Sequence, residues 1–353
     1  MSRTILIMAG GTGGHVFPGL AVADYLKAAA WRVVWLGTQG GMEGKLVPAR
    51  GYEMVHIRFS GVRGKGALRW LLLPVQLLLA FWQSARAIFK VRPDVVLGMG
   101  GYPAFPGGMM AALLNKPLLI HEQNSIAGLT NRILAKVADR VLMAFPNALP
   151  GGVLTGNPVR NDIASLPAPE TRYAGRSGPL RVLVVGGSLG AQALNETLPQ
   201  ALAMIAPGVR PLVTHQAGAR HIESLREHYR KSGVDGELLS FIDDMACRYA
   251  ECDLVICRAG ALTVSELAVA GVAAILVPFP HAVDDHQTVN ARYLVERGAA
   301  VLLPQTELSA SRLAQLLQEM TRERLLQMAM KARALGEPQA TEKVAWACME
   351  LAQ

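Results

Sequence analysis

In the first half of the chain the hydrophobic positions form short runs that are apolar throughout, and longer segments with a helical pattern separate them. The runs predict β-strands at residues 4–10, 32–38, 53–59, 94–100, 117–123 and 140–145. Helical patterns lie between them, for example over 18–30 and 104–115. Strands that are apolar on both faces and alternate with helices are typical of a parallel sheet covered on both sides.

A second series of the same kind follows a segment rich in Pro, Gly and Ser at 165–179, which we interpret as a loose linker. Its strands are predicted at 181–187, 209–215, 237–242, 253–259, 273–279 and 299–305. A length of 353 residues also favours two domains. The pattern therefore predicts an α/β fold of two Rossmann-like, doubly wound domains with an interdomain cleft. We expect domains at 1–160 and 161–336, and a C-terminal helix over 337–353 that is a candidate to pack back on the first domain.

Three glycine clusters, at 9–15, 98–108 and 185–191, stand where a predicted strand ends. Glycine permits a positive φ there and lets backbone N–H groups approach a ligand closely. The following helix adds a partial positive charge at its N-terminus, which favours a phosphate or diphosphate. A single loop of this kind is often only a tight turn, but three at equivalent places indicate a phosphate-bearing ligand.

Two common phosphate-binding motifs are absent from these loops. The dinucleotide fingerprint fails at the first loop, where Val16 occupies the position of the third glycine, and the second strand's end carries no acidic residue for a ribose. A P-loop fails at 39–46, because Gln39 replaces the first glycine and Leu46 replaces Ser or Thr. Hydride transfer and NTP hydrolysis are therefore disfavoured.

The sequence gives little support for metal chemistry. The carboxylates at 243–244 and 284–285 are adjacent pairs, whose neighbours point to opposite sides of an extended chain, and we expect one member of each to be a helix N-cap. The four cysteines form no C-x-x-C pair and no secretory leader precedes them, so we expect reduced thiols in a cytoplasm: Cys247, Cys252, Cys257 and Cys348. No metal and no cofactor is expected.

His15 differs from the other histidines because it closes the first glycine loop, where a phosphate-bearing ligand would approach. A single histidine is most often structural, and His56, His215, His221 and His228 lie in ordinary strand or helix patterns. At the edge of the loop, however, His15 is a candidate general base.

The net charge of +8 is unevenly divided along the chain. Residues 1–160 hold 17 Lys and Arg against six Asp and Glu, whereas residues 161–353 hold 18 against 21. The basic half therefore faces an anionic partner, either nucleic acid or membrane. Nucleic acid is disfavoured, because this half lacks interleaved aromatic residues and any recognition motif.

An uncharged segment from Trp70 to Ala85 favours the membrane. It is too short to span a bilayer and its helical pattern is apolar on more than one face. One face can pack on the sheet, but a second face with Trp70, Phe81 or Trp82 would remain in water. Cations flank the segment, with no acidic residue between Glu53 and Asp94: Arg58, Arg63, Lys65, Arg69, Arg86, Lys90 and Arg92. This combination predicts a surface that lies on anionic lipid.

A set of longer motifs covers both predicted domains in order and resembles the MurG family of bacterial undecaprenyldiphospho-muramoylpentapeptide β-N-acetylglucosaminyltransferases. The motifs are AGGTGGHVFPGLAVA, GMGGYPAFPG, HEQNSIAGLTNR, GNPVR, VVGGSLGA, FIDDM, CRAGALTVSELAVAGVAAILVPFP and DDHQTVNA. The resemblance implies the GT-B glycosyltransferase architecture and an inverting, metal-independent transfer. The implied reaction transfers N-acetylglucosamine (GlcNAc) from UDP-GlcNAc to the 4-hydroxyl of MurNAc-pentapeptide on undecaprenyl diphosphate. This step converts lipid I to lipid II in peptidoglycan synthesis.

The resemblance also implies roles for particular residues. Backbone at Ile242 reads uracil, Glu266 binds the ribose hydroxyls and Ser188 holds the diphosphate. Asn124 and Gln287 bind the GlcNAc hydroxyls, and Arg160 faces the donor. The diphosphate is also capped at a helix start by Ala261, Leu262, Thr263, Val264 and Ser265. Thr12, Gly13 and Gly14 close on the donor from the first domain. Leu189 and Cys257 stand where many relatives have glutamine and serine, which weakens side-chain contacts there but not backbone ones.

An inverting transfer needs a base that removes the proton of the acceptor hydroxyl, and His15 fits by type and place. Glu122 or His121 could share this role. The implied partners are UDP-GlcNAc, undecaprenyl-diphosphate-MurNAc-pentapeptide, anionic membrane lipid and, as further candidates, other cell-wall synthesis or division proteins. The implied location is peripheral, on the cytoplasmic face of the cell inner membrane. Two alternatives remain open, a UDP-GlcNAc epimerase of the same architecture and a related glycolipid glycosyltransferase.

Overall fold

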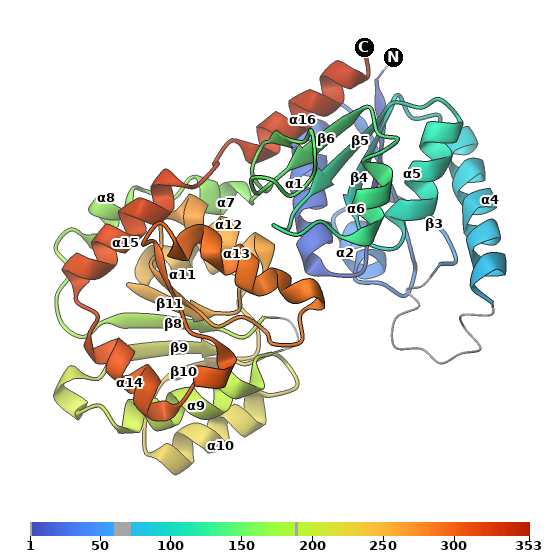
Figure 1. Ribbon diagram of the computed structural model, residues 1–353. Helices are drawn as coiled ribbons and strands as arrows, with labels where there is room; N and C mark the ends of the chain where they lie inside the picture. Colours follow the sequence, from blue (N-terminus) through green and yellow to red (C-terminus); the bar gives the residue numbers. More distant parts are fainter. Residues whose placement is uncertain (1, 60–71, 188–189) are drawn as a thin grey trace. The chain divides into compact units, whose positions relative to one another are not determined.

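Both series of predicted strands form parallel sheets in the structure, a computed structural model that describes residues 2–59, 72–187 and 190–353 (Figure 1). The chain divides into two units, each with its own sheet. The first holds the residues up to Arg160 together with Gln339–Gln353, and the second holds Asn161–Pro338. This is the predicted fold class of two doubly wound α/β domains.

The sheet of the first unit has the strand order β3-β2-β1-β4-β5-β6-β7, and every pairing is parallel. Six of its strands match the predicted runs within a few residues at each end, and β7 is a short edge strand that no pattern predicted. The strands are β1 (Thr4–Ala9), β2 (Arg32–Gly37), β3 (Glu53–His56), β4 (Val95–Gly100), β5 (Leu118–Glu122), β6 (Arg140–Met143) and β7 (Val153–Leu154).

Alternate residues of β1 point into two separate cores, one on each face of this sheet. Ile5 and Ile7 pack against α1 (Gly13–Ala28) and α16 (Ala340–Leu351). Leu6 and Met8 belong to the core of the opposite face, which α4 (Leu73–Val91), α5 (Ala104–Leu113) and α6 (Leu129–Leu134) cover. Both faces of the strand are therefore buried, which explains why its sequence is apolar without alternation.

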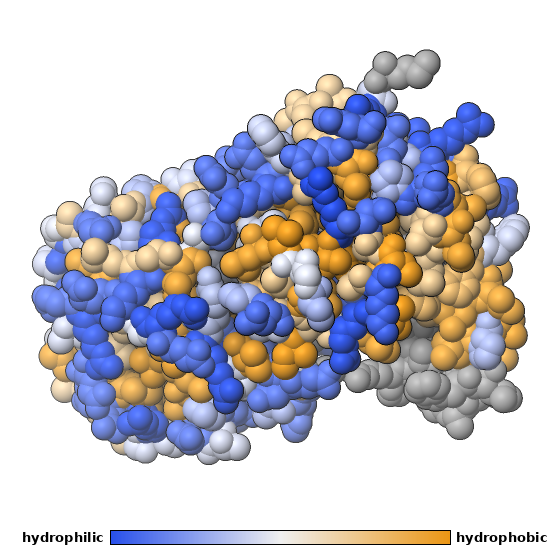
Figure 2. All heavy atoms as spheres, turned by 45° about the horizontal axis from the view of Figure 1, so that its top comes forward, coloured by the Kyte–Doolittle hydropathy of each residue, from blue (hydrophilic) through white to orange (hydrophobic). Residues whose placement is uncertain are grey.

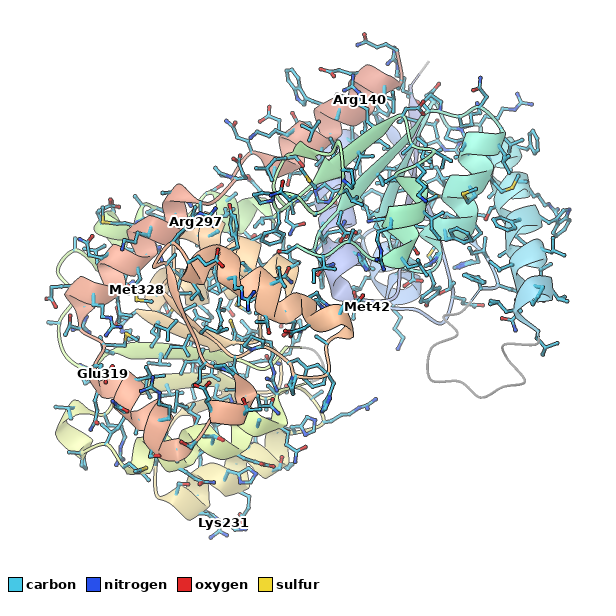
Figure 3. The ribbon with its side chains drawn as sticks, viewed as in Figure 1. Met42, Arg140, Lys231, Arg297, Glu319 and Met328 are labelled. Carbon is cyan, nitrogen blue, oxygen red and sulfur yellow. The ribbon has the colours of Figure 1, made fainter. Side chains whose placement is uncertain are left out.

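The C-terminal helix α16 belongs to the first unit. It packs against α1, and Val344, Ala345 and Cys348 are buried in their shared core. Arg140 of β6 forms a 2.6 Å ion pair with Glu350 near the end of the helix (Figure 3). The last residues of the chain thus complete the unit that its first residues begin.

The second unit has a six-stranded parallel sheet with the order β10-β9-β8-β11-β12-β13. Its strands are β8 (Arg181–Val185), β9 (Leu212–Gln216), β10 (Glu237–Leu239), β11 (Leu254–Cys257), β12 (Ala274–Leu276) and β13 (Ala300–Leu302). The helices between and after them are α9 (Gln192–Ala203), α10 (Ile222–Ser232), α11 (Met245–Glu251), α12 (Ala261–Ala270), α13 (His286–Val295), α14 (Ala310–Gln318) and α15 (Arg322–Ala334).

The segment at 165–179 is not the loose linker that its composition predicted. After the short helix α7 (Asn161–Ala164) it forms α8 (Pro169–Tyr173), and its arginines anchor it to the second unit. Arg172 donates to the carbonyl oxygens of Tyr249 and Ala270, at 2.8 and 2.6 Å. Arg176 forms a 2.6 Å ion pair with the buried Asp253. These polar contacts add to apolar packing, since Tyr173 of α8 is buried in the core of the second unit.

The first helix also differs from its prediction at 18–30. It begins at Gly13 and contains Pro18, because Gly13 and Gly14 adopt helical conformations themselves. Pro18 lies in the second turn, where it removes one N–H group from the helix without ending it. The helix therefore starts directly at the first glycine loop.

Candidate functional site

In each sheet the strand order reverses between two neighbouring central strands, β1 and β4 in the first unit and β8 and β11 in the second. The chains that leave such a pair at the carboxyl end turn to opposite faces and open a crevice, where ligands of doubly wound sheets bind. The first and second glycine clusters follow β1 and β4, and the third follows β8. All three predicted phosphate loops therefore lie at a reversal point.

A buried carboxylate holds the first glycine loop in place. Glu43 of α2 (Glu43–Ala49) is fully buried, and its Oε2 accepts from the backbone N–H of Gly11 at 3.1 Å. Its Oε1 accepts from both the N–H and the hydroxyl of Thr38, at 3.1 and 2.7 Å. A methyl group at Gly10 would lie 2.6 Å from Oε1, so the close packing of this loop requires glycine. The carboxylate joins the loops after β1 and β2.

His15 lies in the first turn of α1, directly after the predicted contacts Thr12, Gly13 and Gly14. Thr12 is the N-cap, but its side chain does not cap the helix, so the N–H groups of Gly13 and Gly14 have no partner inside it. The half-buried ring of His15 lies against Gly100, which has a φ of +95°. A methyl group at Gly100 would lie 3.2 Å from His15 Nδ1 and Cε1. The first and second glycine clusters thus meet around this ring.

The end of β5 supplies a third side of this site. Glu122 is buried, and its carboxylate accepts from the N–H groups of Asn124 and Gly128 and from the amide of Asn131, at 2.9 to 3.2 Å. These bonds give Glu122 a structural role. Burial lowers the pKa of His121 to about 4. His121 has no exposed surface and its Nε2 contacts the carbonyl oxygen of Gly156 at 2.9 Å. Both are therefore poorly placed to take a proton from a substrate, unlike His15.

In the second unit, Gln216 at the end of β9 holds the glycine loop after β8. Its Oε1 accepts from the N–H of Gly187 at 3.0 Å, and its Nε2 donates to the carbonyl oxygens of Gly187 and Ser240. Ser188, the predicted diphosphate contact, and Leu189 lie outside the described residues. The described glycines on either side of them have positive φ values, 80° at Gly187 and 78° at Gly190.

The predicted nucleotide contacts of the second unit gather at the start of α12, which follows β11 after three residues. Gly260 is the N-cap and has no side chain to cap the helix, so the first N–H groups of the helix face the loop. Ala261 and Val264 are buried, and the other predicted contacts on this helix are partly exposed: Leu262, Thr263, Ser265 and Glu266. The hydroxyl of the buried Tyr249 donates to Glu266 Oε2 at 3.3 Å and orients this carboxylate.

Four more predicted positions lie on loops or helix starts. Ile242 is buried in the loop between β10 and α11, Arg160 is partly exposed at the end of the first unit, and Asn124 is partly exposed after β5. Gln287 lies in the first turn of α13, where its Oε1 accepts from the N–H of Phe279 at 2.9 Å. A ligand that uses this oxygen has to compete with the backbone.

The two aspartate pairs precede helices as predicted. Asp244 and Asp285 occupy the N-cap positions of α11 and α13, but neither side chain accepts a hydrogen bond from a backbone N–H of its helix, so the capping bond we expected is absent. Asp285 Oδ1 instead accepts from the hydroxyl of Thr288 at 2.7 Å. Asp284 and Asp285 both have positive φ values, 54° and 50°, an uncommon conformation for non-glycine residues. Within the described part of the chain, no group of three or more His, Cys, Asp or Glu is arranged to hold a metal ion. All four cysteines are free.

A separate surface feature lies on α4, whose buried face consists of Ala80, Ser84, Ala87, Ile88 and Val91. Large apolar side chains on its other face are exposed: Leu72, Val75, Leu78, Leu79, Trp82 and Phe89. Figure 2 shows hydrophobic surface along the side of this unit where α4 lies. Arg86 lies over the Trp82 ring at 5.7 Å, and Lys90 is exposed. We call these exposed apolar side chains, together with Arg86 and Lys90, the α4 surface. Four other residues predicted to belong to this surface lie outside the described residues: Arg63, Lys65, Arg69 and Trp70. Phe81, also predicted there, is half-buried and packs against Phe105.

None of the described helices is long and apolar enough to cross a membrane.

Sequence reasoning missed the side chains that support the site rather than line it. Glu43, Gln123, Gln216 and Tyr249 were not singled out, although all four are buried. The sequence carried a signal for Glu43, Gln123 and Gln216. Each is a polar residue at the end of an apolar strand or at the start of the next helix, and such positions lie at the carboxyl edge of a parallel sheet. Tyr249 carries no such signal.

Comparison with known proteins places the chain in a family. The glycosyltransferase family 28 N-terminal domain matches residues 5–143 and the glycosyltransferase family 28 C-terminal domain matches residues 181–345. A Nitrosospira multiformis protein named UDP-N-acetylglucosamine--N-acetylmuramyl-(pentapeptide) pyrophosphoryl-undecaprenol N-acetylglucosamine transferase is 66% identical over 99% of both chains. The Ralstonia nicotianae protein of the same name is 61% identical over 100% of this chain and 98% of its own.

Solved structures agree with this placement. The crystal structure of MurG from Acinetobacter baumannii matches with a TM-score of 0.87 and 43% identity over 99% of both chains. A Listeria monocytogenes structure described as a UDP-N-acetylglucosamine 2-epimerase matches with a TM-score of 0.64 at 13% identity, over 98% of this chain and 95% of its own, which indicates a shared fold alone. The chain therefore belongs to glycosyltransferase family 28 and, within it, to the MurG family.

Proposed function

We propose that this chain transfers N-acetylglucosamine from UDP-GlcNAc to the 4-hydroxyl of MurNAc-pentapeptide on undecaprenyl diphosphate, the step from lipid I to lipid II. The observation that carries the proposal is the 66% identity, over 99% of both chains, to a relative named for this transfer. The helix starts and glycine loops at both reversal points fit a substrate that carries a diphosphate. The epimerase alternative is supported by the shared fold only.

We assign the donor to the loops of the second unit. The carboxylate of Glu266, oriented by Tyr249, binds the ribose hydroxyls, and backbone at Ile242 reads the uracil ring. The diphosphate meets the N–H groups at the start of α12 and the glycine loop that contains Ser188. The GlcNAc hydroxyls bind Gln287 and Asn124, and Arg160 and the N–H groups of Thr12, Gly13 and Gly14 complete the donor contacts.

The chemical step requires a base for the proton of the acceptor hydroxyl and a stabilising group for the negative charge on the leaving diphosphate. As the acceptor hydroxyl attacks the anomeric carbon its proton passes to a base, and we assign that base to His15, a partly exposed imidazole in a loop built for close approach. The UDP leaving group gains negative charge at its diphosphate. Backbone N–H groups at helix starts already point to such a position and stabilise that charge without a metal.

We also propose that the enzyme is peripheral and docks by the α4 surface on the cytoplasmic face of the cell inner membrane. Exposed aliphatic and aromatic side chains beside Arg86 and Lys90 match the requirements of an anionic bilayer surface. Because a polyprenyl acceptor stays in the membrane, an enzyme that docks there finds it without extracting its chain. Other cell-wall synthesis or division proteins are candidate partners at the same location.

The first prediction concerns activity itself. The purified chain should transfer GlcNAc from UDP-GlcNAc to a short-chain lipid diphosphate-MurNAc-peptide, measured by mass spectrometry of the product. Transfer should continue at an unchanged rate in EDTA, since the leaving charge is met by N–H groups. Loss of activity on chelation with recovery in Mg²⁺ or Mn²⁺ would overturn the metal-independent step, and inactivity under all conditions would overturn the function.

The second prediction tests the ribose contact. Glu266→Ala should weaken UDP binding by about 1–3 kcal/mol in titration calorimetry, because hydrogen bonds between a charged carboxylate and the ribose are lost. Glu319→Ala is the matched control, since Glu319 is exposed at the end of α14 (Figure 3). Wild-type protein that binds ADP as tightly as UDP would contradict the assignment.

The third prediction tests the base. His15→Ala should lower kcat by roughly 10² to 10⁴ while UDP binding changes little, as expected when a general base is removed. His56→Ala removes an exposed imidazole from the same unit and should leave kcat unchanged. If His15→Ala keeps most of the wild-type kcat, the base lies elsewhere.

The fourth prediction tests the α4 surface in liposome sedimentation. Binding should require anionic lipid and weaken with salt. Replacing both Arg86 and Lys90 by Glu should abolish it, whereas the same charge change at Lys231 and Arg324, exposed on the second unit, should not. Trp82→Ala should reduce the binding that remains at high salt, because the apolar contact is not screened. Equal binding to neutral vesicles, or none to anionic ones, would refute docking by this surface.

A further inference from the structure

A continuous chain of buried hydrogen bonds ends on the ring of His15. It begins at the carbonyl oxygen of Gly156, which lies 2.9 Å from His121 Nε2. His121 Nδ1 lies 3.1 Å from Gln123 Nε2, and Gln123 Oε1 lies 2.8 Å from His15 Nδ1. His121 and Gln123 are both almost completely buried. Water therefore has little access to the two central links of the chain.

The carbonyl oxygen of Gly156 determines the protonation of His121. A carbonyl oxygen only accepts hydrogen bonds, so His121 Nε2 must carry a proton to bond with it. Desolvation by burial lowers the pKa of His121 to about 4, and the ring is therefore neutral near pH 7. A neutral imidazole has one N–H group, which leaves Nδ1 as an acceptor for the amide of Gln123.

A second carbonyl oxygen fixes the orientation of the Gln123 amide independently. Gln123 Nε2 also donates to the backbone oxygen of His121 at 3.1 Å. Rotating the amide by 180° would place Oε1 against that carbonyl oxygen and against the lone pair of His121 Nδ1, so the rotated form loses two hydrogen bonds and gains two repulsions. Asn157 Nδ2 holds the backbone at this place by donating to the carbonyl oxygen of Gln123 at 3.0 Å. Gln123 Oε1 must therefore face His15.

We infer that Gln123 is a positioning residue that keeps His15 in the tautomer with a proton on Nδ1, so that the Nε2 lone pair is available to the acceptor hydroxyl. This rests on the proposed function of His15 as the base. An amide oxygen only accepts, so the ring nitrogen that faces it carries the proton. The other nitrogen of a neutral ring is then the basic one. The opposite tautomer would present an N–H group to the substrate and could not take its proton.

The test has one arm that needs no activity. Protein with ¹⁵N-labelled histidine gives long-range ¹H–¹⁵N correlations that distinguish protonated from unprotonated ring nitrogens, and His15→Asn and His121→Asn spectra assign the two rings among the eight histidines. At a pH where the titration shows His15 to be neutral, its Nδ1 should be protonated, and His121 should be protonated on Nε2. A His15 ring protonated mainly on Nε2 would overturn the inference.

The second arm uses Gln123→Met, which keeps a side chain of similar length but removes all three hydrogen bonds of the amide, one to His15 and two to His121. The His15 tautomer should shift toward Nε2–H, and kcat should fall by roughly 10- to 100-fold, less than on loss of the base itself. The KM for UDP-GlcNAc should stay within about twofold, which a general disruption of the fold would not allow. Gln315→Met on α14 is the exposed control.

The outcomes separate this inference from the proposed function. An unchanged kcat and unchanged tautomer in Gln123→Met would overturn the role of Gln123 while the wild-type enzyme remains active. A wild-type chain without transfer activity would overturn the function, while the ¹⁵N spectra of the same protein still decide whether the hydrogen-bond chain fixes the His15 tautomer. The wild-type spectra decide this even where the variant does not fold.

Discussion

In both units, the point at which the strand order of the sheet reverses determines where a ligand can bind. Beside β1 and β4, and again beside β8 and β11, the chain leaves the sheet toward opposite faces, so backbone groups at that edge have no neighbouring strand to pair with. Helices α1 and α12 begin there without a side-chain cap, which leaves N–H groups in need of an acceptor. A diphosphate is an acceptor suited to such N–H groups. Packing also requires the glycines, since a methyl group at Gly10 would lie 2.6 Å from Glu43 Oε1.

Hydrogen bonds from buried polar side chains hold these loops in place. Glu43 joins the loops after β1 and β2, and Gln216 bonds to the glycine loop after β8 through both ends of its amide. Glu122 gathers the N–H groups of the turn that carries Asn124. Each of these side chains accepts a hydrogen bond from a buried N–H group that would otherwise have no partner. The free-energy cost of leaving such a group unpaired is larger than the net gain of an ordinary hydrogen bond.

These supports also explain what could be predicted from the sequence. Apolar runs separated by helical patterns made twelve strands predictable, including the partly exposed Glu53–His56, whereas the two-residue edge strand Val153–Leu154 was too short to leave such a pattern. His15 could be proposed as the base because it stands beside its glycine loop in sequence. Glu43 is 32 residues from the Gly11 amide that it holds, and no local pattern connects such partners. The anchoring of 165–179 was missed for the same reason, since Arg172 bonds to carbonyl oxygens 77 and 98 residues away.

The use of an amide rather than a carboxylate beside His15 has a physical consequence for the protonation of the ring. A carboxylate at Nδ1 would orient the ring equally well, but its negative charge would favour the protonated imidazole, which is not a base. The Gln123 amide orients the ring through hydrogen bonds alone and adds no net charge. Because His121 is kept neutral by burial, the chain from Gly156 to His15 fixes the orientation of the His15 ring without placing a charge beside it.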